Sequence, residues 1–299
     1  MITRMELRAS PCYIAVVAAR NEERFIGHSI RSVLNQTIPP RVCVLSDDGS
    51  SDRTPFVAAE EGAEVLYYEK PRSNMRGINQ AYAIIAGVLE ASYEVPDWEY
   101  LLKFDGDTII PPNYVKHLIT KMEKDPGLGI CSGMPYNEKI RLARASDAAK
   151  LYRRECWDDI KGLDVIHAFD SHALLKAAQA GWRTRTIPTA SFREMRSSRK
   201  YGLSRWVFTG FARASFGLPL YHTVFAAAKN IRWGWPPILN FFTTIFAHIL
   251  SNWPQAPNLE REWVRRYAIS EVTTYMREIW KLFKDKTRAK TIVKSHSAQ

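Results

Sequence analysis

The first 190 residues of the chain alternate short apolar runs with amphipathic stretches. Runs rich in Val, Ile, Leu and Tyr predict strands at residues 13–18, 41–46, 64–68, 99–104 and 128–132. Apolar residues at helical spacing predict helices between them, at residues 23–35, 52–61, 77–91 and 112–124. Strands that alternate with helices favour the α/β class, with a Rossmann-like, mostly parallel sheet that carries helices on both faces.

Charged residues follow the predicted strands. In an open sheet of this kind, ligands bind beyond the carboxyl ends of the strands. A single charged loop there is a common turn, but four at one edge predict a binding site. The four loops are ARNEE at 19–23, DDGS at 47–50, EKPRSNMRG at 69–77 and DGD at 105–107.

The pattern changes after residue 200. No Asp, Glu, Lys or Arg lies between Arg232 and Glu260, and an apolar run extends from Trp235 to Trp253. A helix over that run would be about 27 Å long, close to the thickness of a bilayer core. The apolar segment 206–228 is interrupted and predicts a second span or a partly inserted helix. The alternative for this region is a buried helical hairpin of a soluble protein.

Positive charge is concentrated in the same part of the chain. Residues 181–299 hold 20 of the 42 Lys and Arg but only 6 of the 31 Asp and Glu, which indicates an anionic partner. Apolar segments flanked by Trp favour a membrane, and nucleic acid is the alternative. Eight basic residues flank the hairpin and two lie in its loop, which predicts a catalytic domain and C-terminus on the cytoplasmic side.

We therefore expect three parts: a catalytic domain at 1–200, a membrane-associated helical hairpin at 201–255, and a basic C-terminal helix or tail at 256–299. Residues 260–290 have the spacing of a basic amphipathic helix, lying on a membrane surface or docked on the catalytic domain. The four cysteines are widely spaced, which indicates reduced thiols rather than a zinc site, and the first residues lack a signal-peptide pattern.

The ordered motifs AARNEE, SDDGSSDRT and DGD resemble glycosyltransferase family 2, whose members use nucleotide-diphospho-sugars and have a GT-A fold. The match is to small membrane-associated members, similar to the cellulose-synthase-like or dolichyl-phosphate-mannose-synthase-like branch. The resemblance implies that Asp105 meets the ribose or a metal and that Asp107 ligates Mg²⁺ or Mn²⁺. It also implies a nucleotide pocket formed by Asp48, which approaches the base, with Ala18, Arg20, Glu22 and Arg76.

Carboxylates on a tight bend suit that chemistry. A departing sugar diphosphate gains negative charge, so a clamped cation stabilises the transition state more than the ground state. Gly106 between the two acids lets the backbone approach a ligand closely.

Two later motifs of the family are altered. The family's Glu-Asp pair, whose Asp is the general base, appears here as Phe169 and Asp170 at a predicted helix start. Asp170 could instead be a simple N-cap, and Asp164 is the reserve candidate for the base. The family's Gln-x-x-Arg-Trp motif keeps Arg205 and Trp206 but has lost the Gln.

The resemblance implies that Trp206 stacks on the acceptor sugar. The basic segment with Arg199 and Arg205 is placed to bind acceptor phosphates. We expect an inverting hexosyltransferase that passes a sugar, with GDP-mannose favoured over a UDP-sugar, to a lipid-linked acceptor in glycan or glycolipid biosynthesis. The alternatives are transfer to a polyprenyl phosphate, and an inactive, membrane-anchored binding protein.

Overall fold

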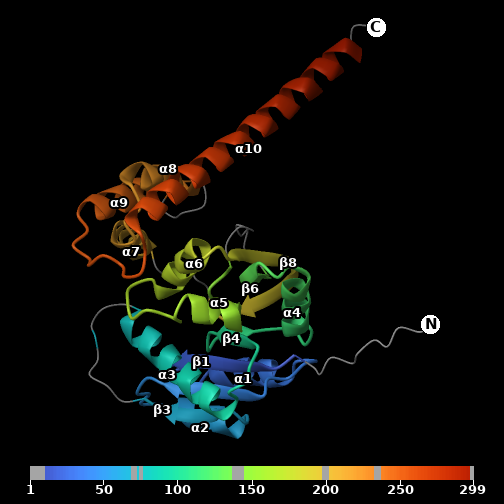
Figure 1. The fold of residues 1–299 in the computed structure, drawn as a ribbon, viewed down its shortest axis with the longest axis vertical. Coiled ribbons are helices and arrows are strands. Elements are labelled where there is room, and N and C mark those ends of the chain that lie inside the picture. Colours follow the sequence, from blue (N-terminus) through green and yellow to red (C-terminus); the bar gives the residue numbers. More distant parts are fainter. Residues whose placement is uncertain are drawn as a thin grey trace. The chain divides into compact units, whose positions relative to one another are not determined.

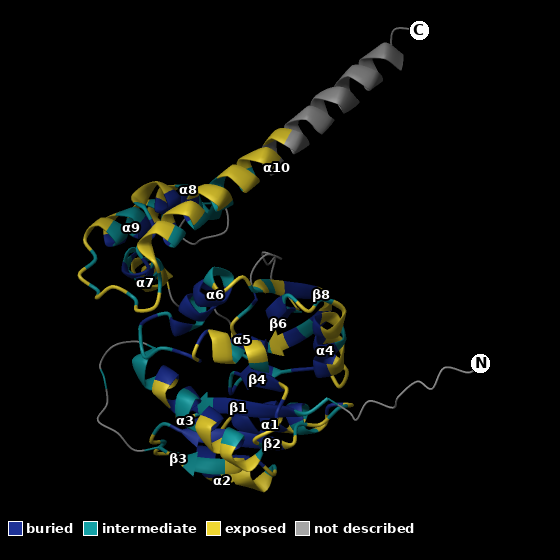
Figure 2. Cartoon of the chain, in the orientation of Figure 1, coloured by how far each residue is buried: buried dark blue, intermediate teal, exposed yellow. Residues whose placement is uncertain are grey.

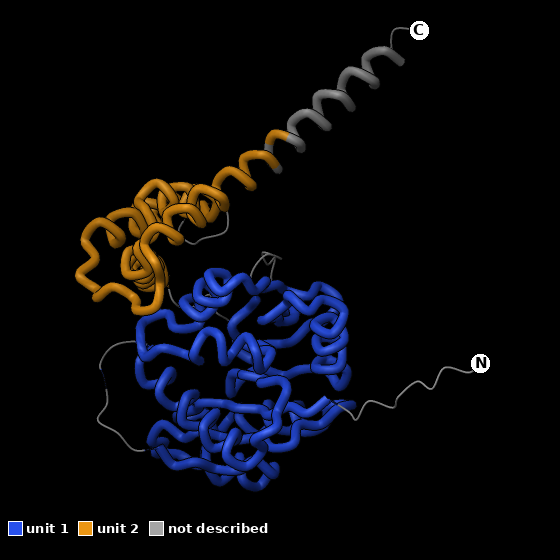
Figure 3. The backbone as a smooth tube through the Cα atoms, in the orientation of Figure 1, with its two compact units in different colours: residues 1–198 blue, residues 199–299 orange. Residues whose placement is uncertain are grey.

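The computed structural model describes residues 11–68, 73, 77–136, 145–196, 202–231 and 237–296, with the backbone alone at 237, 278, 279 and 281–296. The chain divides into two compact units, residues 1–198 and residues 199–299 (Figure 3). The three-part division expected from the sequence stays a prediction.

The first unit is built on one eight-stranded sheet in the order β3-β2-β1-β4-β7-β6-β8-β5 (Figure 1). Its strands are β1 Tyr13–Ala19, β2 Val42–Asp47, β3 Glu64–Tyr67, β4 Tyr100–Phe104, β5 Thr108–Ile109, β6 Leu128–Pro135, β7 Ala149–Arg153 and β8 Arg183–Glu194. The five predicted strands are confirmed as β1, β2, β3, β4 and β6.

The sheet is mixed, so the expectation of a mostly parallel sheet is wrong for its second half. β3, β2, β1 and β4 are parallel neighbours. β7 then lies antiparallel to both β4 and β6, while β6 and β8 pair in parallel. Short β5 pairs antiparallel with β8. The alternation of strand and helix that indicates parallel pairing ends after β4.

Helices cover both faces of the sheet, as predicted. The helices of this unit are α1 Ile26–Leu34, α2 Thr54–Glu60, α3 Ile78–Glu94, α4 Tyr114–Lys124, α5 Arg154–Asp159 and α6 Phe169–Gln179. One core layer lies under α1, α2 and α4, and the other lies under α3, α5 and α6. Figure 2 shows the buried strands between helices whose outer sides are exposed.

The local sequence explains these elements. β1 is buried along nearly its whole length because it is central in the sheet, so it is apolar throughout and does not alternate. α1 buries Ile26, Ile30 and Val33, which share one helical face. Such burial is the main stabilising term of the unit, at about 1.5–3 kcal/mol for each fully buried aliphatic side chain.

The helices among the described residues of the second unit are α7 Gly202–Ser215, α8 Leu220–Asn230, α9 Pro237–Ile249 and α10 Arg261–His296. The predicted C-terminal helix is present as α10. The segment expected to be one span or inserted helix at 206–228 is divided into α7 and α8. Gly217, with a φ of 71°, and Pro219, the N-cap of α8, break the helix between them.

The expected transmembrane helix over Trp235–Trp253 is not formed. α9 has 13 residues, and that length corresponds to about 20 Å. None of the helices among the described residues is both long and apolar enough to cross a membrane. Membrane association in any other form stays a prediction.

Candidate active site

The carboxyl ends of the first four strands share one edge of the sheet. In the register, Ala19 lies opposite Asp47, and Asp47 lies opposite Tyr67. β4 runs parallel to β1 on its other side. The loops after β1, β2 and β4 therefore meet there, as predicted from their charge. The predicted fourth loop, 69–77, falls outside the described residues except for Ser73 and Gly77.

Hydrogen bonds join the loops after β1 and β2. The Asn21 backbone N–H donates to Ser50 Oγ at 3.0 Å, and Asn21 Oδ1 accepts from the Ser51 N–H at 2.8 Å. Arg20 Nε donates to the Gly49 carbonyl at 3.3 Å. Asn21 has a φ of 55°, a left-handed conformation that Asn tolerates better than most residues. These hydrogen bonds hold the loops after β1 and β2 together, and Arg20 takes part in them.

The two aspartates that follow β2 have different roles in this loop. Buried Asp47 accepts a hydrogen bond from the Ser50 N–H at 3.0 Å and so closes the loop on itself. Asp48, the predicted contact to the nucleotide base, is half-buried and comes next. Ala18 lies at the end of β1 opposite Ser46, at the same edge.

The DGD segment forms a bend directly after β4. The Asp105 N–H donates to the Ala148 carbonyl at 2.9 Å, and the Thr108 N–H donates back to the Asp105 carbonyl at 3.1 Å. Gly106 at this bend faces Ile26 Cδ1, 3.4 Å from where a Cβ atom would lie. The chain turns here, and the turn presents both carboxylates at the edge of the sheet.

Arg196, two residues after β8, bridges two carboxylates of the predicted site. Its Nε donates to Asp107 Oδ2 at 2.8 Å, and its Nη2 donates to Glu22 Oε1 at 2.6 Å. The side chains of Asp107 and Glu22 are each 15% exposed, whereas that of Arg196 is 49% exposed. The loop after β1 and the DGD bend are therefore connected through one guanidinium.

The electrostatics of this bridge favour a cation. The pKa of Glu22 is raised, mainly by burial and also by the charges of Asp107 and Asp52. The contact with Arg196 lowers this pKa but does not outweigh those effects. The two carboxylates raise the pKa of Arg196 against the effect of its burial. Glu22 Oε2 is buried and has no hydrogen-bond partner within the described part of the chain. An orphaned carboxylate oxygen beside Asp107 is poorly stabilised until a donor or cation reaches it.

The residues present fit a hard divalent metal of the Mg²⁺ or Mn²⁺ type. Asp105 and Asp107 offer carboxylate oxygens, and Arg196 joins Asp107 to Glu22. Across the described ranges there is no group of three or more potential metal ligands. Mg²⁺ commonly binds proteins through one or two carboxylates together with substrate phosphates, so this donor set suits a metal that arrives with a diphosphate.

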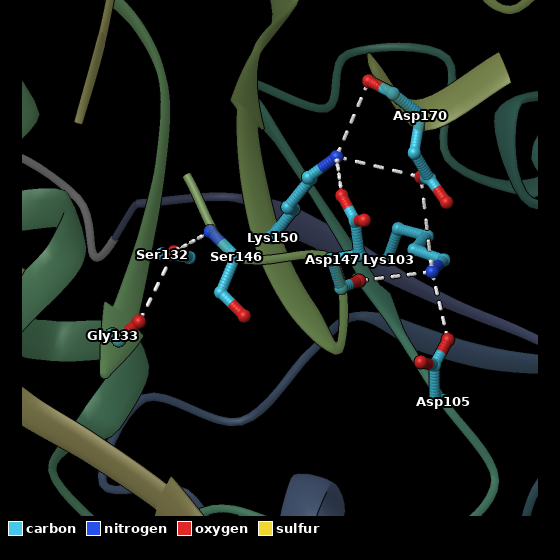
Figure 4. Close-up of polar contacts among 8 residues, drawn as sticks. All are labelled: Lys103, Asp105, Ser132, Gly133, Ser146, Asp147, Lys150 and Asp170. Atoms are coloured by element: carbon cyan, nitrogen blue, oxygen red, sulfur yellow. Dashed lines mark hydrogen bonds and ion pairs between the residues drawn. The ribbon is translucent and has the colours of Figure 1, made fainter. Parts of the chain in front are cut away.

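Asp170 lies in the first turn of α6, and the alternative that it is only an N-cap is wrong. The N-cap is Ala168, with a φ of 52°, and no side-chain hydrogen bond caps the helix. Asp170 Oδ1 instead lies 3.4 Å from Lys150 Nζ and 3.9 Å from Lys103 Nζ (Figure 4). Lys103 Nζ also donates to Asp105 Oδ1 at 2.7 Å, so one network holds the predicted base and the first Asp of the bend.

Asp164, the reserve candidate for the base, anchors the loop before α6. Its Oδ2 lies 2.5 Å from Lys176 Nζ and 3.3 Å from His172 Nδ1. Burial acts to raise its pKa, but the hydrogen bonds from His172 and Lys176 outweigh burial and lower it. Lys176 Nζ also donates to the carbonyls of Ile160 and Gly162, at 2.6 and 3.0 Å. These contacts give Asp164 a structural role.

The other predicted residues lie outside this geometry. Arg76 and Arg199 are outside the described residues. Arg205 and Trp206 lie near the start of α7, in the second unit, where the Arg205 guanidinium lies 5.9 Å from the centre of the Trp206 ring. Their roles stay predictions.

Lys103, Lys150, Asp147 and Arg196 were not predicted as site residues. Lys103 interrupts the apolar run of a predicted strand, in YLLKF. A lysine in a fully buried strand is rare, so this break in the apolar pattern was a usable indication of a site. Lys150 lies in β7, which was not predicted.

A family model described as "Glycosyl transferase family 2" matches residues 14–178, more than half of the chain. Among curated proteins, the chain is 29% identical over 126 residues to a poly-beta-1,6-N-acetyl-D-glucosamine synthase of Staphylococcus epidermidis, covering 40% of the chain and 27% of the relative. It is 26% identical over 144 residues to the putative glycosyltransferase EpsH of Bacillus subtilis, covering 48% of the chain and 40% of the relative. The matches thus span less than half the length of either relative.

Two solved structures have a similar fold. One is the mannosyltransferase PcManGT of Pyrobaculum calidifontis in complex with GDP-Man and Mn²⁺, with a TM-score of 0.55 and 19% identity over 90% of this chain and 76% of that one. The other is residues 1–349 of Staphylococcus aureus TarS in complex with UDP-GlcNAc, with a TM-score of 0.51 and 15% identity over 68% of this chain and 65% of that one. These similarities support a GT-A-like fold with a mixed sheet.

Proposed function

Because the chain belongs to glycosyl transferase family 2, we propose that it is an inverting hexosyltransferase with a nucleotide-diphospho-sugar donor. The observation that carries the proposal is the pair Asp105 and Asp107 on the bend after β4: Arg196 links Asp107 to Glu22, and Lys103 links Asp105 to Asp170. GDP-mannose is the favoured donor. A fold relative solved with UDP-GlcNAc makes UDP-sugars the first alternative.

The donor occupies the edge formed by β1, β2 and β4. Asp48 contacts the base, and Ala18, Arg20, Glu22 and Arg76 line the pocket. A Mg²⁺ or Mn²⁺ ion bound by Asp107 and Asp105 would supply positive charge for the departing diphosphate. Asp170 accepts the proton of the acceptor hydroxyl, whose oxygen attacks the anomeric carbon opposite the leaving group.

The acceptor in this proposal is lipid-linked, and the enzyme works at the cytoplasmic surface of a membrane. Arg199 and Arg205 bind acceptor phosphates, and Trp206 stacks on the acceptor sugar. α9 supports the membrane part, because its exposed side is apolar at Ile238, Phe242, Phe246 and Ile249. A helix of that length with one apolar face suits insertion parallel to the surface.

A donor panel tests the proposed activity. Release of nucleoside diphosphate from GDP-mannose, UDP-glucose and UDP-N-acetylglucosamine is measured with Mn²⁺, with and without a lipid extract. We expect one donor to be consumed and Asp107→Asn to slow its consumption by about two orders of magnitude. Asp97→Asn, an exposed carboxylate, is the control and keeps the wild-type rate. Full activity in Asp107→Asn would rule out the metal assignment.

The acceptor class is tested through Asp170. A polyprenyl phosphate is already ionised and needs no base, so Asp170→Asn would keep most of the rate with that acceptor. With a hydroxyl acceptor the same variant loses about 100-fold or more. A protein that binds no nucleotide sugar in calorimetry, with or without Mn²⁺, is not a transferase of this kind.

A further inference from the structure

Two buried lysines face each other beneath the candidate active site. Lys103 of β4 and Lys150 of β7 are direct partners in the antiparallel register, and they are 2% and 0% exposed. Lysine is almost never fully buried unless it is paired, because removing an ammonium group from water is costly. Two such groups on neighbouring strands therefore indicate a specific role.

Each ammonium group contacts two aspartates. Lys103 Nζ donates to Asp105 Oδ1 at 2.7 Å and to the Asp147 carbonyl at 2.9 Å, and it lies 3.9 Å from Asp170 Oδ1. Lys150 Nζ lies 2.6 Å from Asp147 Oδ1 and 3.4 Å from Asp170 Oδ1. Figure 4 shows both lysines directed toward the same oxygen of Asp170.

We propose that Lys103 and Lys150 are positioning residues for Asp170: together they fix its Oδ1 and direct its second carboxylate oxygen toward the acceptor. This proposal rests on the proposed function, in which Asp170 is the base. A base must lie within hydrogen-bond reach of the proton that it accepts, and small displacements are costly to the rate.

Lys150 also fixes the helix that carries Asp170. Its Nζ lies 3.4 Å from the Asp170 backbone carbonyl, so it holds the first turn of α6 as well as the side chain. Ala168, the N-cap of α6, is in a left-handed conformation. An ammonium group donates to a carbonyl and cannot accept from the orphan N–H groups of a helix start, so Lys150 does not replace a cap; it ties the first turn of α6 to β7.

The charges favour positioning over simple packing. A buried ion pair seldom stabilises a fold more than apolar residues of the same volume, so stability alone does not explain two buried lysines. Asp147 and Asp170 raise the pKa of Lys150 against the effect of burial. Lys150 is therefore charged at neutral pH and holds the carboxylates as a cation.

Lys150→Met gives the cleanest test, because Lys103 also contacts Asp105 at the predicted metal site. The full chain is compared with Lys150→Met, Asp170→Asn, the double variant, Lys150→Arg and Leu118→Ala. Leu118 is fully buried in α4 on the opposite face of the sheet, so its truncation controls for lost stability. Turnover is measured as nucleoside-diphosphate release from the donor that the panel identifies, with Mn²⁺ and with water as acceptor.

We expect Lys150→Met to lower kcat by about tenfold or more, with KM and the donor Kd from calorimetry changed by less than about twofold. The double variant is then about as slow as Asp170→Asn alone, because both changes disable one unit. Lys150→Arg recovers part of the rate. The positioning role would be overturned if Lys150→Met turned over as fast as Leu118→Ala. It would also be overturned if the losses of kcat in the two single variants multiplied in the double variant.

A second measurement does not depend on activity. Urea unfolding of the same variants gives a double-mutant cycle for Lys150 and Asp170, and we expect the two effects to be coupled by about fivefold in the unfolding equilibrium constant. Additive effects would overturn the proposal. If Asp170→Asn keeps the wild-type turnover, the assignment of the base fails, and this cycle alone then decides whether Lys150 holds Asp170.

Discussion

Arg196 contacts Asp107, which is predicted to ligate a metal, and Glu22, which is predicted to line the nucleotide pocket. A guanidinium and a divalent cation satisfy the same need of Asp107 and Glu22 for positive charge, so they compete for Asp107. The bridge keeps these two acidic groups from repelling each other. Arg196 therefore matters most before the donor binds.

Replacing Arg196 with Ala is expected to raise the affinity of the donor-free protein for Mn²⁺ by several-fold, because a competing positive charge is removed. Free Mn²⁺ measured by electron paramagnetic resonance reports this without any turnover. Arg53→Ala is the matched control, since Arg53 is exposed and pairs with Glu60 at 3.2 Å, away from Asp107. Weaker Mn²⁺ binding in Arg196→Ala would show that Arg196 orients Asp107 and does not compete with the metal.

A carboxylate pair away from the site links stability to pH. The hydrogen bond that protonated Glu64 donates to Glu94 raises the pKa of Glu64 to about 7, with burial and the charges of Glu94 and Glu90 acting in the same direction. The folded protein thus holds this proton more tightly than the unfolded chain does. The stabilising contribution is complete below a pH of about 4.5 and is lost as the pH rises through about 7.

The urea concentration at the unfolding midpoint should therefore decrease as the pH is raised from 5 to 8. In Glu64→Gln this decrease should be smaller. A glutamine donates a hydrogen bond to Glu94 at any pH, so the variant is expected to be more stable than the wild type at pH 8. Glu155→Gln, which changes an exposed carboxylate in α5, is the control for the loss of one charge. If the urea midpoint of Glu64→Gln decreased with pH as steeply as that of the wild type, Glu64 and Glu94 would not share a proton.

At the scale of elements, the first half of the fold was predictable from the sequence and the second half was not. β1 to β4 and α1 to α4 follow local periodicity, and their bounds lie within a few residues of the predicted ones. β7 was not predicted because its sequence, AKLYR, contains the charged residues Lys150 and Arg153, and a third charged residue, Arg154, follows directly at the start of α5. Its strand conformation depends on antiparallel pairing with β4 and β6, which no local pattern encodes.

The site divides in the same way. The strand-end carboxylates and Asp170 could be predicted, because motif order and strand ends fix their place in the fold. The ion pairs that Lys103, Lys150 and Arg196 make with distant residues could not be predicted, because the partners are between 20 and 174 residues apart. The pairs of Lys103 with Asp105 and of Lys150 with Asp147 are local. Only the folded sheet brings the distant partners together.

α9 has an arrangement opposite to that of an ordinary soluble helix. Its buried side carries Asn240, Thr244 and Ala247, whereas its exposed side is apolar. Gly210 of α7 packs against it so closely that an added Cβ would lie 2.6 Å from Ala247 Cβ. An exposed apolar side suits a helix that lies in a membrane surface, with its small and polar residues packed against α7.

Phe246→Glu is expected to weaken binding of the full chain to lipid vesicles by about tenfold, because a charge would enter the apolar layer. Phe246 is 58% exposed, so the change should leave the fold intact. Vesicle flotation measures the effect, and Leu89→Glu, at a 67% exposed apolar position of α3, is the control. Equal flotation of both variants and the wild type would exclude α9 as the lipid-binding face.

At the scale of the whole molecule, charge and apolar surface occur in the same part of the chain. Residues 181–299 carry an excess of 14 positive charges, from 20 Lys and Arg against 6 Asp and Glu, while residues 1–180 carry the remaining 22 and 25. A basic surface alone fits either an anionic membrane or a nucleic acid. The apolar face of α9 favours the membrane, because nucleic acid has no apolar layer to receive it.

Salt separates these two partners. Binding to vesicles of anionic phosphatidylglycerol should weaken as NaCl rises from about 0.1 to about 0.5 M, but it should persist, because burial of the α9 face is not screened. Binding to a short DNA duplex should be weak at about 0.1 M NaCl and absent at about 0.5 M NaCl, because only electrostatic attraction to the phosphates would hold the duplex. A duplex bound more tightly than the vesicles at low salt would instead make the basic third a nucleic-acid surface, and it would remove the main support for a lipid-linked acceptor.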